Sequence, residues 1–156
     1  MIKIFYITYF FLFNFINQEV VNTYNSDNYN YSWKVNYSEN CFLPFTDSEI
    51  AMLNDVFVDN LDTYVLDKPN RALDIKDILR NRVNIYKEEI KDISNYPLLS
   101  SVGLFNIFNN NETPPVFDKD NFNPLIYNFE FGSKSRQVYR VDNTNYLIII
   151  NSKFSK

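Results

Sequence analysis

Histidine is absent from this chain of 156 residues, and cysteine and glycine are almost absent. Without histidine the chain cannot form a Ser-His-Asp or Cys-His catalytic set, and it lacks the commonest zinc ligand. The single cysteine, Cys41, excludes an internal disulfide and a four-thiolate metal site. We expect Cys41 to be a small buried residue, with a disulfide between two chains as the alternative. The two glycines are too few for a phosphate-binding P-loop or a dinucleotide fingerprint, so no cofactor and no metal are predicted.

Carboxylates are the catalytic groups that remain. Asp59 and Asp62 share a face of one predicted helix, and Asp74 and Asp77 share a face of the next. Pairs of carboxylates hydrolyse glycosides in many enzymes, but acids near a helix start are favoured by the helix dipole alone. We expect both pairs to be ordinary solvated residues. A carboxylate-only glycan hydrolase is kept as the lesser alternative to a protein without enzymatic activity.

The segment 118–120 (Asp-Lys-Asp) begins like a calcium-binding loop. Phe122 stands where the third ligand is needed, and Asn123 stands where the motif requires glycine. We therefore expect a polar loop at this place rather than a metal site.

The overall composition indicates one packed domain. Hydrophobic residues make up 46% of the chain and aromatic residues 18%, which is typical of a globular protein with a real core. The net charge of −4 speaks against nucleic acid as a partner, because phosphate contacts need clustered Lys and Arg.

The amino-terminal residues carry the one sorting signal that the sequence suggests. Lys3 is followed by an apolar run, residues 4–16, interrupted only by Thr8 and Asn14. This run is shorter than the roughly 20 residues that cross a membrane, and its length fits the core of a signal peptide. We therefore expect residues 1–18 to be a signal peptide and the protein to be secreted or periplasmic. The alternatives are an uncleaved membrane anchor and an ordinary first strand of the fold.

Residues 19–44 form a polar segment rich in Asn, Tyr and Ser, which we expect to be a loosely structured arm. Trp33 and Tyr37 are candidates for a partner surface, because these side chains combine a large apolar area with a polar tip. Arg136 and Arg140, on one face of a predicted strand, complete this candidate surface. The alternative is that the aromatic residues cover the sheet and that the arginines are ordinary solvent-facing residues.

Two amphipathic helices are predicted upstream of Pro97. Thr46 and Glu49 have the spacing of a capping box, and the helix behind them extends up to Pro69, which cannot continue it. The second helix is predicted from Arg71 to Ile93. The apolar stripes are Ile50, Leu53, Phe57, Leu61 and Tyr64 in the first helix, and Ile75, Leu79, Val83, Tyr86, Ile90 and Ile93 in the second.

The carboxyl-terminal residues predict a β-hairpin. Tyr146–Ile150 is aromatic or aliphatic without interruption, which indicates a strand buried on both faces. Asn143 suits the turn, because Asn tolerates a left-handed backbone. A turn at this residue places Tyr139, from the partner strand 137–141, opposite Ile148.

Further upstream the signals are weaker. Leu125–Phe131 alternates apolar and polar residues and predicts a half-buried strand, joined to the hairpin by a turn at residues 132–135. These strands together make a three-stranded meander. Residues 98–108 suit either a buried strand or a short helix, and residues 109–123 are predicted to be a loop.

These patterns predict a single α+β domain over residues 45–156, with two amphipathic helices packed on a small antiparallel sheet that ends in a carboxyl-terminal meander or hairpin. The predicted function is that of a small exported, non-enzymatic protein that binds a protein or cell-envelope partner. The alternative is a membrane-tethered structural protein that keeps its amino-terminal anchor.

Overall fold

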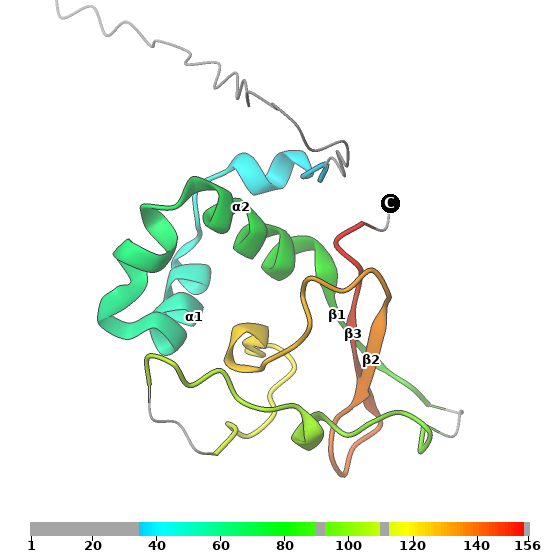
Figure 1. The fold of residues 1–156 in the computed structure, drawn as a ribbon. Helices are drawn as coiled ribbons and strands as arrows, with labels where there is room; N and C mark the ends of the chain where they lie inside the picture. Colours follow the sequence, from blue (N-terminus) through cyan, green and yellow to red (C-terminus); the bar gives the residue numbers. More distant parts are fainter. Residues whose placement is uncertain (1–34, 90–92, 110–112, 155–156) are drawn as a thin grey trace, which may run out of the picture. The chain divides into compact units, whose positions relative to one another are not determined.

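The computed structural model describes residues 35–89, 93–109 and 113–154. The predicted signal peptide, residues 1–18, and Trp33 lie outside these residues. The described part of the chain forms a small α+β fold with helices and a three-stranded antiparallel sheet (Figure 1), which confirms the predicted class. No helix in this part of the chain is long and apolar enough to cross a membrane.

The first helix, α1 (Asp47–Phe57), begins with the predicted capping box. The backbone N–H of Glu49 donates to Thr46 Oγ1 at 3.2 Å, and the Thr46 N–H donates to Glu49 Oε2 at 2.8 Å. These bonds satisfy donors that the first turn of a helix otherwise leaves free. The buried apolar side chains of α1 are Leu53, Val56 and Phe57.

The predicted continuation of this helix to Lys68 is wrong. At Val58 the backbone turns left-handed, with a φ of 47° that a β-branched residue adopts only when its surroundings impose it. A 3-10 turn, η2 (Val58–Asn60), and a π-helical turn, η3 (Asp62–Leu66), follow. This irregular path buries Val65 completely and leaves Tyr64 40% exposed, whereas the regular stripe placed Tyr64 in the core.

The second helix, α2 (Pro69–Asp77), starts directly after this turn. Pro69 stands in its first turn, where the missing N–H costs no hydrogen bond. A π-helical turn, η4 (Ile78–Arg82), extends the helix. The buried residues of the two are Ile75, Ile78 and Arg82.

The prediction of helix as far as Ile93 is wrong beyond η4, because strand β1 (Val83–Lys87) begins there. Val83 and Ile85 are β-branched and lie on the same side of a pleated strand, which suits a sheet as well as their spacing suits a helix. Pairing within the sheet makes this segment a strand rather than a helix, since Ile85 lies opposite Ile148 of the carboxyl-terminal strand.

The sheet has the strand order β1-β3-β2, with β3 (Tyr146–Ile150) in the centre and β2 (Gln137–Arg140) on its other side. The predicted hairpin register is confirmed, because Tyr139 lies opposite Ile148. Asn143 has the expected left-handed backbone, with a φ of 55°. The predicted burial of β3 on both faces is also confirmed. Its buried residues are Leu147, Ile148, Ile149 and Ile150.

Leu125–Phe131 does not form the third strand that the sequence predicts. It begins with a 3-10 turn, η6 (Pro124–Ile126), and only an isolated bridge joins Tyr127 to Leu104. The free side of β3 is taken by β1, and Arg140 of β2 donates its backbone N–H to Pro97. The predicted alternation of side chains is nevertheless confirmed. Leu125, Tyr127 and Phe129 are buried, and Asn128 and Glu130 are exposed.

Two hydrophobic clusters form the core, and the segment 124–131 contributes to both. The first cluster lies between α1, η3 and α2 and includes Leu125. The second lies against the sheet and includes Tyr127 and Phe129. Leu99, from the 3-10 turn η5 (Leu99–Ser101), completes the second cluster. The segment, drawn in gold in Figure 1, thus connects the helices to the sheet.

The described end of the polar arm packs along α2 (Figure 1). It contains a 3-10 turn, η1 (Glu39–Phe42), whose Asn40 donates to the side chain of Asn81 at 2.9 Å. Cys41 is fully buried beside these residues as a free cysteine. Of the two alternatives for Cys41, the structure therefore supports the small buried residue.

Candidate binding groove

A groove of about 600 Å³ opens between the helices and the segments 105–108 and 124–131. We call it the aromatic groove, because ring side chains are the largest group among its lining residues. Its volume falls within the roughly 300–1,000 Å³ that is usual for sites that bind small molecules. The rings that line it include Phe57, Phe105, Phe108, Tyr127, Phe129 and Phe131.

The rings on the helix side of the groove pack against one another. The centroid of Phe108 lies 4.4 Å from that of Tyr64 and 5.7 Å from that of Phe57. The side chain of Asn109 donates to the Asp55 carbonyl at 2.9 Å and so ties this segment to α1. Ile107, at the edge of the groove, leaves 71% of its surface exposed. The groove therefore keeps apolar area accessible to solvent on a wall that is held in place.

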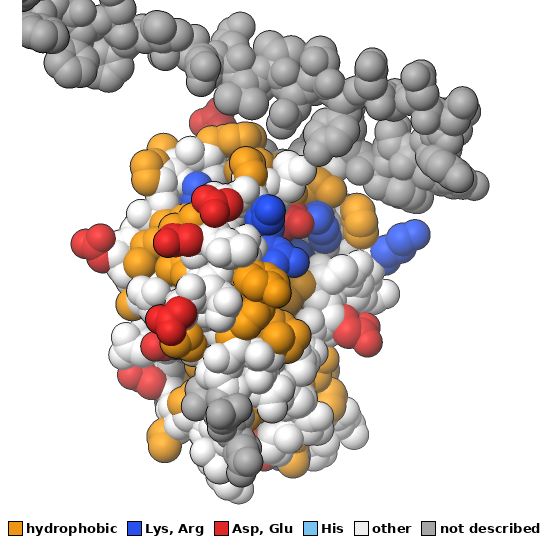
Figure 2. All heavy atoms as spheres, turned by 60° about the vertical axis from the view of Figure 1, so that its left-hand side comes forward, with side chains coloured by type: hydrophobic (Ala, Val, Ile, Leu, Met, Phe, Trp, Pro, Cys, Tyr) orange, Lys and Arg blue, Asp and Glu red, His pale blue; other side chains and the backbone are white. Residues whose placement is uncertain are grey.

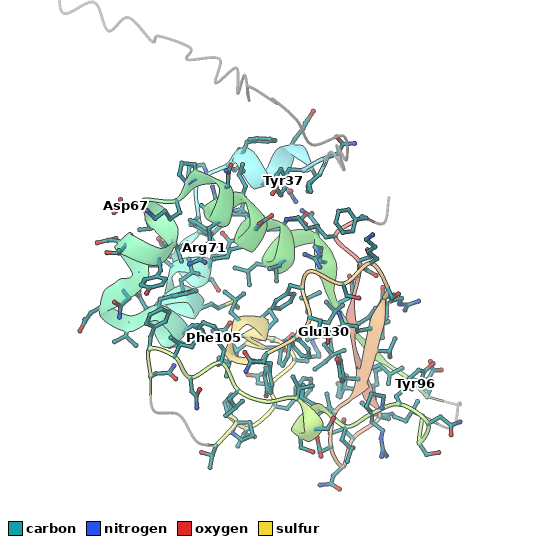
Figure 3. All side chains as sticks on the ribbon, in the orientation of Figure 1. Tyr37, Asp67, Arg71, Tyr96, Phe105 and Glu130 are labelled. Atoms are coloured by element: carbon teal, nitrogen blue, oxygen red, sulfur yellow. The ribbon has the colours of Figure 1, made fainter. Side chains whose placement is uncertain are left out.

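Arg71 of α2 stands at the rim of the aromatic groove. Its Nη1 donates to the Tyr64 carbonyl at 3.1 Å, and its guanidinium lies 5.8 Å from the centre of the Tyr64 ring. Both contacts orient the planar guanidinium. Figure 3 shows Arg71 extending from α2 on the side of the fold that carries Phe105. Among the described residues, no carboxylate forms an ion pair with Arg71.

A second hollow, of about 560 Å³, adjoins the groove at Tyr64 and Arg71, which line both. We call it the basic hollow. Its lining residues are Thr63, Tyr64, Lys68, Pro69, Asn70 and Arg71. Two cations and no carboxylate are among them. Figure 2 shows Lys and Arg side chains, with Asp and Glu side chains among them, next to a band of hydrophobic side chains on one face of the molecule.

A third hollow, of about 530 Å³, lies near η5 and differs in its charge. Its one charged residue is Asp142, which accepts hydrogen bonds from the Ser100 backbone at 3.0 Å and from the Ser100 hydroxyl at 2.6 Å. These bonds hold the pKa of Asp142 below its ordinary value. The carboxylate is thus held by Ser100 and stays ionised, so the one charge that lines this hollow is negative.

The predicted carboxylate pair Asp74 and Asp77 serves contacts within the fold. Asp74 accepts hydrogen bonds from the Tyr37 hydroxyl and from Lys153 Nζ, the latter at 2.6 Å. Burial and the bond to Asp74 raise the pKa of Tyr37 well above its ordinary value, so the hydroxyl stays protonated and donates. Asp77 accepts from the side chain of Asn81 at 3.1 Å.

The other acidic candidates lie at the surface. Asp59 and Asp62 are both exposed, in η2 and η3. Asp118 accepts hydrogen bonds from the Asp120 backbone and the Asn121 side chain, which is the geometry of a polar loop. Within residues 35–89, 93–109 and 113–154, no group of three or more Cys, Asp or Glu side chains is placed to hold a metal ion.

The residues of the predicted partner surface occupy different parts of the fold. Trp33 lies outside the described residues, and Tyr37 is half-buried against Asp74. Arg136 is exposed. Arg140 is half-buried in β2, and its Nε is buried without a hydrogen-bond partner. That these four residues form one binding surface stays a prediction.

The aromatic groove itself was not identified from the sequence. Tyr64 was predicted to be a core residue and Arg71 was predicted only to begin a helix. The groove exists because residues 105–108 and 124–131 lie beside the helices, and no local sequence pattern predicts that arrangement. The high aromatic content was the only sign of it.

Comparison of the chain with protein-family models, with curated proteins and with solved structures found no match. Any function therefore has to be argued from the chemistry of the groove and of the basic hollow beside it.

Proposed function

We propose that this chain is a small exported protein without catalytic activity, and that it acts by binding an apolar group of a protein or cell-envelope partner in the aromatic groove. The observation that supports the proposal most is the accessible aromatic wall of the groove. Large apolar side chains that stay open to solvent on a rigid support are typical of binding sites.

The arrangement of the wall favours binding over a purely structural role. The buried residues Phe57 and Phe129 anchor the groove in the two core clusters, so its shape needs no partner. Phe105 and Phe108 pack against the Phe57 ring and are only half-buried. A partner that covers these rings removes apolar area from water, which contributes about 25 cal/mol for each Å².

A neutral fluorescent dye tests whether the groove binds apolar groups. N-phenyl-1-naphthylamine brightens when it leaves water, and we expect the protein to bind it with saturation. Ile107→Asp places a charge at the exposed edge of the groove, and we expect it to weaken binding at least about tenfold. Val116→Asp is the matched control, because Val116 is 95% exposed and lies outside the groove. Equal binding by both variants would refute the proposed site.

The mass of the amino terminus tests the export part of the proposal. After expression from the full-length gene, we expect a mature chain that starts near Glu19 in the soluble exported fraction. A chain that still begins at Met1 in the membrane fraction would support the tethered alternative. An intact chain in the cytosol would contradict export.

A further inference from the structure

We propose that the aromatic groove and the basic hollow together bind one amphipathic anion, with its alkyl chain in the groove and its carboxylate on the guanidinium of Arg71. This inference rests on the proposed function and names the chemistry of the ligand. It is drawn from the contact between the two hollows, since Tyr64 and Arg71 line both of them.

Arg71 is suited to bind a carboxylate. A guanidinium presents five N–H donors in a planar fork that matches the two oxygens of a carboxylate. The Tyr64 carbonyl accepts from Nη1 and the Tyr64 ring lies beside the guanidinium, so the fork is oriented before a ligand arrives. Pre-orientation of this kind lowers the entropy that binding costs.

The acidic groups close to Arg71 do not neutralise it. Asp74, which also lines the groove, accepts hydrogen bonds from Tyr37 and Lys153. Asp67 lies apart from Arg71 in Figure 3, and no ion pair joins the two among the described residues. A ligand carboxylate would therefore meet a guanidinium that has no anionic partner within this part of the chain.

Charge selects among the apolar molecules that fit the groove. Lys68 lines the basic hollow together with Arg71, and no carboxylate is among its lining residues, so the charged groups that the hollow itself presents are cationic. An anionic head group is attracted there, a cationic head group is repelled, and a neutral head group leaves the guanidinium unpaired. An alkyl carboxylate covers the apolar wall with its chain and pairs with the cations through its head group.

Displacement of the neutral dye by three matched amphiphiles tests this inference. The probes are decanoate, 1-decanol and decyltrimethylammonium, each used below the concentration at which it forms micelles. We expect decanoate to displace the dye at a roughly tenfold lower concentration than decanol, because a hydrogen-bonded charge pair adds to the same apolar contact. Decyltrimethylammonium should be the weakest competitor.

Substitution of Arg71 tests whether this residue causes the preference for decanoate over decanol. Arg71→Gln should bring decanoate and decanol to equal potency while dye binding is retained, and Arg71→Lys should keep part of the preference. Lys87→Gln removes one positive charge from an exposed residue outside both hollows and should leave the preference unchanged. Equal potency of decanoate and decanol in the unsubstituted protein would overturn the inference.

Two further outcomes separate this inference from the proposed function. If the dye binds and Ile107→Asp abolishes its binding, but decanoate has no advantage, the groove is an apolar site and the anion is not its ligand. If the dye does not bind at all, the proposed function fails first. Sedimentation that shows a dimer which decanoate does not dissociate would place a second copy of the chain in the groove and would also overturn the inference.

Discussion

The guanidinium of Arg80 holds both carboxylate oxygens of Glu49. Arg80 Nε lies 2.6 Å from Glu49 Oε1, and Nη2 lies 2.6 Å from Oε2. The same guanidinium donates to the carbonyls of Asn40 and Pro44. Arg80 in η4 therefore connects the end of the second helix to the start of α1 and to the chain that leads into it. Each of the two side chains is only 12% exposed, so solvent screens the pair weakly.

Arg80→Ala should lower the free energy of unfolding by about 2–3 kcal/mol, because it leaves the Glu49 carboxylate largely buried without its cation. Urea unfolding measures this loss. Arg80→Lys should lose less, since it keeps the charge but not the fork. Arg136→Ala is the control at an exposed arginine and should stay within about 0.5 kcal/mol of the unsubstituted protein. A loss at Arg80 no larger than this control would contradict the structural role.

The stability of the protein should fall in acid in a way that depends on Glu49. The hydrogen bond from Arg80 holds the pKa of Glu49 below its ordinary value of 4.5. The unfolded chain then binds more protons than the folded chain across this window, so stability rises with pH. The contribution is complete above about pH 4.5 and is lost as the pH falls through the lower pKa of the folded state.

Urea midpoints measured from about pH 6 down to about pH 3 test this dependence. Other carboxylates also titrate in this range, so the informative quantity is the difference between the unsubstituted protein and Glu49→Gln. We expect that difference to shrink as the pH falls. A difference that stays constant over the whole range would show that the charge of Glu49 contributes nothing.

Val58→Gly should stabilise the fold by about 1 kcal/mol, because glycine adopts positive φ without steric cost. Val58 combines a φ of 47° with a ψ of −127°, and its side chain is 44% exposed, so little buried area is lost. Thermal unfolding measures the change. Val116→Gly is the control, since Val116 is 95% exposed and its φ is not positive, and it should be neutral or slightly destabilising. An equal loss in both variants would show that Val58 is unstrained.

Features that depend on neighbouring residues were predicted well from the sequence. The capping box needs only Thr46 and Glu49, which are three positions apart, and both of its hydrogen bonds form. The hairpin register follows from a turn at Asn143 and a short distance along the chain, and Tyr139 lies opposite Ile148 as expected. Local interactions of this kind are the same in most folds that contain the segment.

Features that depend on distant partners were not predicted. Val83–Lys87 has both a helical and an extended spacing of apolar residues, and its pairing with β3, about sixty positions later in the chain, makes it a strand. Leu125–Phe131 has the pattern of a strand, but the outer edge of β2, where a meander would place it, contacts Pro97 and Leu98 instead. The contact between Arg80 and Glu49 depends likewise on two helices meeting.

The sequence by itself determined the α+β class, the start of α1, the hairpin and the burial of β3. Each of these features follows from the spacing of residues that lie close together along the chain. Tertiary structure alone decided where β1 lies, which carboxylates pair with which cations, and that Tyr64 and Arg71 stand between an apolar groove and a basic hollow. The physical reason is that packing joins residues whose separation along the chain carries no information about their distance in space.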